Sequence, residues 1–168
     1  MGQKLGIVTD VQAVESGEMI VSPSLMLLDV ATLSPYFDEV LLFSPGRPVF
    51  DLRAPGLHRV PRRNLRVVQV PGFWPRRFAG FAVSWPRIWW GLRRVLRRAD
   101  LVCIRMPALC SLVGHRLCRR MGIPYYVTIR GDWADQWRIL GTRGGWRRVL
   151  PRLAWVADRI TLEVARDA

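Results

Sequence analysis

The sequence has few of the residues from which metal and disulfide sites are built. Its three cysteines, Cys103, Cys110 and Cys118, contain no C-x-x-C pair, and its two histidines, His58 and His115, are far apart. No group of these residues has metal-ligand spacing, so we expect no metal. An odd number of unpaired cysteines is typical of reduced core thiols in a cytosolic protein.

Long hydrophobic runs are also missing. The longest apolar stretch, residues 19–37, is interrupted by Pro23, Asp29 and Pro35, and it is too polar to span a bilayer. The apolar run after Lys4 is only as long as a strand, which does not fit a signal peptide. The sequence contains no internal repeat and no low-complexity tract, and we expect the chain to stay in the cytoplasm.

Acidic residues are scarce relative to basic ones. The 26 Lys and Arg residues face 13 Asp and Glu residues, which gives a formal net charge of +13. Such a charge favours anionic partners: a phospholipid surface, nucleic acid or a phosphate-bearing substrate. The alternative is a solvated, arginine-rich face without a partner. Half of the 168 residues are hydrophobic, so we expect one folded domain, residues 1–168, with a real core.

The apolar pattern predicts strands that alternate with helices. Strand-length runs occur at residues 4–9, 39–43, 65–70, 101–104, 125–129 and 159–164. Helical patterns occur at residues 23–33, 86–98, 107–121 and 146–157. Residues 11–22 and the basic, proline-rich residues 44–64 read as loops. This alternation predicts a doubly wound, Rossmann-like α/β fold with a parallel sheet of six or more strands.

Polar residues stand at the ends of three of these runs. Asp10 follows the first, Arg105 the fourth, and Arg130-Gly131-Asp132 the fifth. Because open α/β sheets bind ligands beyond the carboxyl ends of their strands, we expect Asp10, Arg105 and Arg130 to converge at one rim. Asp10 could equally be a turn or helix-entry residue.

Each of the other candidates has a functional and a structural interpretation. The guanidinium of Arg130 suits phosphate, and its alternative is a salt bridge to Asp132 or Asp135. Asp132 could orient an acceptor hydroxyl or act as a base, or it could cap the helix that begins near Trp133. Gly17 allows a close approach to a phosphate, and an ordinary turn explains it as well.

The segment from Trp74 to Arg98 mixes large aromatic residues with arginine. Tryptophan prefers the headgroup region of a bilayer and arginine attracts anionic lipid. We therefore predict membrane contacts by Trp74, Phe78, Trp85, Arg93 and Arg97. The same mixture can stack and clamp single-stranded nucleic acid, and the aromatic residues could instead belong to the core.

Several passages carry a family resemblance. Ala99-Asp100-Leu101-Val102 leads, through the helix that Pro107 opens, to Gly122-Ile123-Pro124; Arg130-Gly131-Asp132-Trp133 forms a turn; and Ala157-Asp158-Arg159-Ile160 comes near the end. With the opening strand, the loop around Gly17 and the following helix, these passages resemble the amino-terminal, acceptor-side domain of family 4 glycosyltransferases, which have the GT-B fold. The resemblance covers nearly the whole chain.

The resemblance implies a transferase that moves a sugar from a nucleoside-diphosphate sugar to an envelope glycan or a lipid-linked acceptor. It gives catalytic roles to Arg130 and Asp132 and substrate contacts to Asp10, Gly17, Arg105 and Gly131, with no cofactor bound by this chain. The donor would be a hexose-type nucleotide-sugar, and the site of action the inner face of the plasma membrane. The competing hypothesis is a basic, non-enzymatic module that binds nucleic acid, although no recognised nucleic-acid motif occurs.

The sequence also departs from the family pattern. Many members have histidine where Arg130 stands, and their first loop has two or more adjacent glycines where this chain has Gly17. Family members bind the nucleotide-sugar in a second, carboxyl-terminal domain with paired glutamates. These 168 residues contain no such domain, so we expect that the chain is a fragment, that a separate domain or chain supplies the donor site, or that the protein is no longer an active enzyme.

Overall fold

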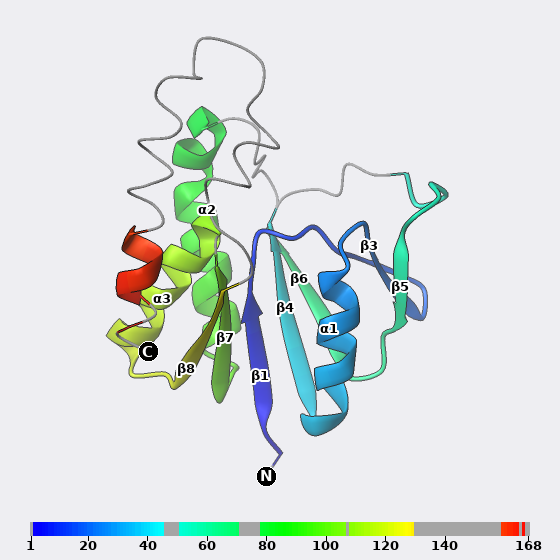
Figure 1. Cartoon of the computed structure of the whole chain (residues 1–168), viewed down its shortest axis with the longest axis horizontal. Coiled ribbons are helices and arrows are strands. Elements are labelled where there is room, and N and C mark those ends of the chain that lie inside the picture. The colour runs from blue at the N-terminus through cyan, green and yellow to red at the C-terminus, as the bar shows by residue number, and fades with distance from the viewer. Residues whose placement is uncertain are drawn as a thin grey trace.

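The computed structural model describes residues 2–45, 51–70, 78–106, 108–129, 159–164 and 166. Five parallel strands form the main sheet in the order β6-β4-β1-β7-β8 (Figure 1). Their bounds are β1 Lys4–Val8, β4 Glu39–Pro45, β6 Leu65–Val70, β7 Leu101–Met106 and β8 Tyr125–Ile129. The predicted doubly wound α/β architecture is therefore confirmed.

Helices cover both faces of this sheet, and a small second sheet lies beside α1. The helices are α1 Met26–Leu33, with the short 3₁₀ helix η1 Ser34–Tyr36, α2 Phe78–Leu96 and α3 Leu109–Met121. The antiparallel sheet has the order β2-β3-β5, with β2 Val14–Ser16, β3 Met19–Ser22 and β5 His58–Pro61. None of the helices in the described ranges is long and apolar enough to cross a bilayer.

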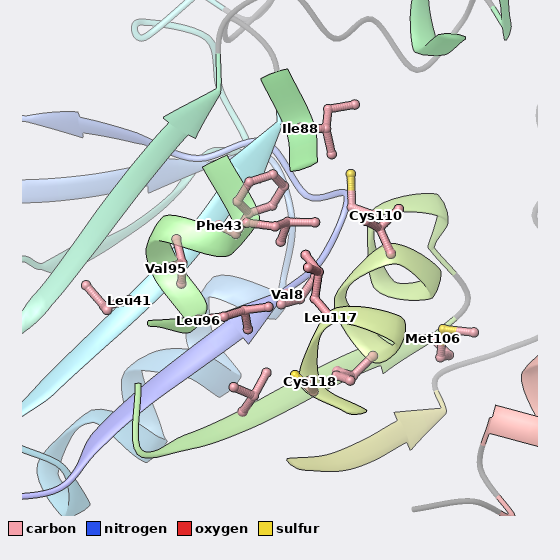
Figure 2. Close-up of a cluster of buried hydrophobic side chains, with 14 residues drawn as sticks. Val8, Leu41, Phe43, Ile88, Val95, Leu96, Met106, Cys110, Leu117 and Cys118 are labelled. Atoms are coloured by element: carbon pink, nitrogen blue, oxygen red, sulfur yellow. The ribbon is translucent and has the colours of Figure 1, made fainter. Parts of the chain in front are cut away.

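Two hydrophobic clusters fill the space on either side of the sheet. Val8 and Phe43 point to one face and pack with Ile88 of α2 and Leu117 of α3 (Figure 2). The alternate residues of the same strands point to the other face, where they pack with α1 and the small sheet. A Cβ added at Gly114 would lie 3.0 Å from Val8 Cγ1, so glycine lets α3 pack closely on β1.

The cysteines belong to these clusters, as predicted for core thiols. Cys103, Cys110 and Cys118 are all buried and free. Burial raises the pKa of the Cys118 thiol to about 12. Burial, and then the nearby Asp10 carboxylate, also raise the pKa of Cys110. Both thiols are therefore neutral near pH 7 and poor nucleophiles.

The prediction of a sixth strand at residues 159–164 is wrong, because the structure shows a helix there. Thr161 and Val164 are buried three positions apart, and Arg159 pairs with Glu163 across one helical turn at 3.9 Å. Both spacings are those of a helix. A short apolar run with β-branched residues does not by itself separate strand from helix.

The two predicted loops also contain strands. Residues 11–22 hold the hairpin of β2 and β3, and residues 44–64 hold β5. The side chain of Glu15 links this small sheet to the main one: it accepts a hydrogen bond from Val67 N at 2.9 Å and pairs with Arg62 at 3.1 Å. Strands of three or four residues carry too little periodicity to be recognised in a sequence.

Two helices begin at other residues than predicted. α1 starts at Met26 rather than Pro23, and the hydroxyl of Ser24 accepts a hydrogen bond from Met26 N at 3.3 Å. α2 starts at Phe78 and contains Pro86 in its interior, where we expected a helix start. Ser84 and Ile88, on either side of Pro86, are both buried, and this packing compensates for the backbone hydrogen bond that proline cannot donate.

Candidate functional site

The carboxyl ends of three neighbouring strands define the edge where we expect the site. β1, β7 and β8 are adjacent and parallel, so Val8, Met106 and Ile129 end at the same edge of the sheet. Arg130, Gly131 and Asp132 follow directly after Ile129 and lie outside the described residues. The chain therefore reaches this edge at the end of each of these three strands.

Asp10, which follows β1, contacts the start of α3. Its Oδ1 accepts a hydrogen bond from Cys110 N at 3.1 Å. Ala108, at the N-cap position of α3, makes no side-chain cap of its own. Asp10 therefore supplies, from a distant part of the sequence, the acceptor and the negative charge that the amino end of a helix favours.

We expect Asp10→Ala to lower the free energy of unfolding by about 1 kcal/mol, because a backbone N–H of α3 loses its acceptor. Asp10→Asn keeps a side-chain oxygen and should stay within a few tenths of a kcal/mol of the parent. Urea unfolding followed by circular dichroism measures both differences. Equal stability of the parent and Asp10→Ala would contradict the capping role.

Arg105 lies inside β7 and points toward α1. Its Nη2 donates a hydrogen bond to Asp29 Oδ2 at 3.0 Å, and only 13% of the Arg105 side chain is exposed, against 41% for Asp29. This ion pair fastens α1 to the sheet. α1 and α3 cover opposite faces, so the side chains of Asp10 and Arg105 share an edge of the sheet without converging.

Two polar residues of β8 join Arg105 on the α1 face, and sequence reasoning did not single them out. Thr128 pairs with Arg105 in the strand register, and its Oγ1 lies 3.8 Å from Cys103 Sγ. Burial raises the pKa of the Tyr126 phenol, and contact with Cys103 adds to this shift, so the phenol is neutral. The signal was present in the period-2 alternation of Tyr126 and Thr128 along β8.

Gly17 occupies the turn between β2 and β3. Its φ is +58°, a left-handed conformation that favours glycine, and no atom lies within 4 Å of the place a Cβ would take. The needs of this turn account for the glycine. The close approach of a phosphate to Gly17 stays a prediction.

The predicted membrane residues divide into three groups. Trp74 lies outside the described residues, and the structure describes no side chain for Phe78. Trp85 is half-buried against the α2–α3 cluster, so its packing matches the alternative that we gave, a core residue. Arg93 is half-buried and Arg97 is exposed, both on α2.

Trp90 is an exposed aromatic residue of α2 that the sequence reasoning missed. Its side chain is 65% exposed, and the guanidinium of Arg93 lies 5.7 Å from the centre of its ring. Arg87, Arg94 and Arg97 are exposed at helical spacing from it. A helical projection would have found Trp90, because it falls off the buried stripe that contains Ile88 and Leu92.

Comparison with known proteins identifies the family. The model of Glycosyltransferase Family 4 matches residues 38–163, which is well over half of the chain. The chain belongs to glycosyltransferase family 4. This confirms the resemblance seen in the sequence and supports a role in glycosyl transfer.

Comparison with curated proteins and with solved structures gives no further information about the function. No curated protein matches the chain. Among the solved structures that match is the carboxyl-terminal domain of a hydrogenase from Pyrococcus furiosus, with a TM-score of 0.45 and 16% sequence identity, covering 75% of this chain and 90% of that one. The stretch that matches family 4 includes Arg105, Arg130 and Asp132, and it begins after Asp10 and Gly17.

Proposed function

We propose that this domain is the acceptor-binding part of a family 4 glycosyltransferase. It binds an envelope glycan or a lipid-linked acceptor, while a donor-binding domain holds a nucleoside-diphosphate sugar. The observation that carries the proposal is the family match across a parallel sheet whose strands β1, β7 and β8 end at one edge. Open α/β sheets bind their ligands beyond the carboxyl ends of the strands, so we place the acceptor at this edge.

The reaction breaks the bond between the sugar carbon and the diphosphate oxygen and forms a bond from that carbon to the acceptor hydroxyl oxygen. The hydroxyl proton passes to a base, for which Asp132 is the candidate. Arg130 stabilises the charge on the departing diphosphate. Catalysis of this kind depends on positioning and on electrostatic stabilisation, and it needs no cofactor bound by the domain.

The neighbouring residues on the α1 face would shape the acceptor side. Arg105 is neutralised by Asp29, so its main effect is to hold α1 in place. Tyr126 keeps its proton and can donate or accept a hydrogen bond. Together they make the α1 face of β7 and β8 neutral and able to form hydrogen bonds, which suits sugar hydroxyls.

The test compares the 168-residue chain alone with the same chain joined to a family 4 donor-binding domain. Release of nucleoside diphosphate is measured over a panel of nucleotide-sugars and acceptors. We expect turnover only in the joined protein. Transfer or nucleotide-sugar hydrolysis by the chain alone would show that the donor site lies within this domain and would overturn the proposed division of labour.

The exposed face of α2 supports a second part of the proposal, attachment to an anionic membrane surface. Arg87, Trp90, Arg94 and Arg97 are all exposed and recur every three or four residues, so they form one stripe along the helix. Each arginine near an anionic bilayer contributes about 1 kcal/mol, and an interfacial tryptophan adds apolar burial. Attachment would bring a lipid-linked acceptor to the domain.

We expect Trp90→Ser to weaken binding to vesicles that contain anionic phospholipid about five- to tenfold, because the ring no longer enters the headgroup region. Co-sedimentation at low and high salt measures the effect. Tyr36→Ser is the control, since Tyr36 is 79% exposed but lies on η1 beside α1. If Trp90→Ser folds and binds as the parent does, the attraction rests on charge alone.

A further inference from the structure

A cavity of about 520 Å³ opens on the layer of α2 and α3, between these helices and the helical residues 159–164. It runs along α3 from Leu112 to Arg120, whereas α3 begins at the carboxyl edge of the sheet. The cavity is therefore separate from the rim proposed for the acceptor. Its volume lies within the range of small-molecule sites, about 300–1,000 Å³.

Positive charge dominates one wall of the cavity. Three arginines, Arg116, Arg119 and Arg120, line this wall from α3. Arg119 and Arg120 follow Arg116 by three and four residues, so both lie on its side of the helix. The carboxylate on the lining is Glu163, and it is already 3.9 Å from Arg159. Guanidinium groups donate hydrogen bonds in a planar fork that matches phosphate oxygens, so this wall suits a phosphate group.

Most of the other lining residues are apolar, and His115, which is buried, is the polar exception. Val113 and Val164 are buried, Trp85 and Leu112 are half-buried, and Ile160 is 38% exposed. The guanidinium of Arg120 lies 5.9 Å from the ring centre of Trp89, which holds this arginine beside α2. A small inorganic anion would leave these apolar surfaces in contact with water, whereas a ligand with a hydrophobic group would cover them.

We propose that this cavity binds a phosphate monoester that carries an apolar chain. The phosphate contacts the arginines of α3, and the chain lies against Trp85, Leu112 and Ile160. This second site does not depend on the proposed acceptor role of the rim. The same chemistry is found in a free alkyl phosphate and in the headgroup of a lipid phosphate in a bilayer.

The first experiment titrates hexyl phosphate, and separately inorganic phosphate, into the full 168-residue chain by isothermal calorimetry. Ile160→Glu places a negative charge on the cavity wall and should weaken hexyl phosphate binding tenfold or more. Leu162→Glu is the matched control, because Leu162 lies on the same helix, is 56% exposed and does not line the cavity. We expect less than a twofold change there.

A second pair of variants separates the cavity from the overall charge. Arg116→Gln with Arg120→Gln should weaken hexyl phosphate binding at least tenfold, while Arg94→Gln with Arg97→Gln removes the same charge from α2 outside the cavity lining and should have little effect. Circular dichroism confirms folding of each variant. If Ile160→Glu does not fold, the arginine pairs decide the matter.

Three results would overturn the proposal: no binding of hexyl phosphate, equal losses in the two arginine pairs, or inorganic phosphate binding as tightly as hexyl phosphate. Neutral vesicles with a small fraction of phosphatidate then identify the source of the ligand. A parallel loss of vesicle binding by Ile160→Glu indicates a lipid in the bilayer. A loss confined to hexyl phosphate indicates a ligand taken from solution.

Discussion

Arg130→Ala should lower sugar transfer tenfold or more in a protein that joins this domain to a donor-binding domain. The alanine removes a guanidinium that we place against the departing diphosphate, and loss of one such charge-stabilising group typically costs at least this much. The effect should fall on kcat rather than KM, because the diphosphate charge grows in the transition state. Release of nucleoside diphosphate under saturating acceptor measures it.

Two further variants serve as controls for Arg130→Ala. Arg130→Lys keeps a positive charge but not the planar fork, and it should recover only part of the rate. Arg159→Ala removes an exposed arginine distant in sequence and should leave the rate unchanged. An unchanged rate in Arg130→Ala would return Arg130 to its structural interpretation, a salt bridge to Asp132 or Asp135.

Phe43→Ala should lower the free energy of unfolding by about 3–5 kcal/mol, a large fraction of the stability of a domain of this size. Phe43 is fully buried in β4, in the cluster that joins the sheet to α2 and α3 (Figure 2). The small side chain would leave a cavity where those helices rest on the sheet. Urea unfolding gives the difference.

Tyr36→Ala is the control for this measurement. Tyr36 is 79% exposed on η1, so the change should stay within about 0.5 kcal/mol. A Phe43→Ala protein as stable as the parent would mean that α2 and α3 are held by other contacts. In that case the arginine stripe and the cavity on this layer would not depend on the core beneath them.

The five parallel strands were predictable from the sequence because each is a short, largely apolar run. Residues 101–104 and 125–129, for example, carry enough β-branched and aromatic residues to read as strands. The small sheet was not predictable. β2 and β5 have only three and four residues, and both become strands by pairing with β3, which adjoins β2 but is far from β5 along the chain.

For the candidate site, the positions of two residues were predictable from the sequence, but the partners of their side chains were not. The order of the elements placed Asp10 and Arg105 at one edge of the sheet, since parallel strands end together. Only the packing of helices decided that Asp10 turns to α3 and Arg105 to Asp29 of α1. A sequence records which residue follows a strand, but the partner of its side chain depends on what is packed above it.

The tryptophans of α2 also show what the sequence determined and what only the tertiary structure decided. The sequence by itself determined that an arginine-rich helix with several tryptophans lies next to the sheet, because its apolar residues recur at helical spacing. Tertiary structure decided which tryptophan is inside: Trp85 packs against the core and Trp90 faces outward. The side of a helix that is buried is set by the surface on which it packs, and that surface exists only in the folded chain.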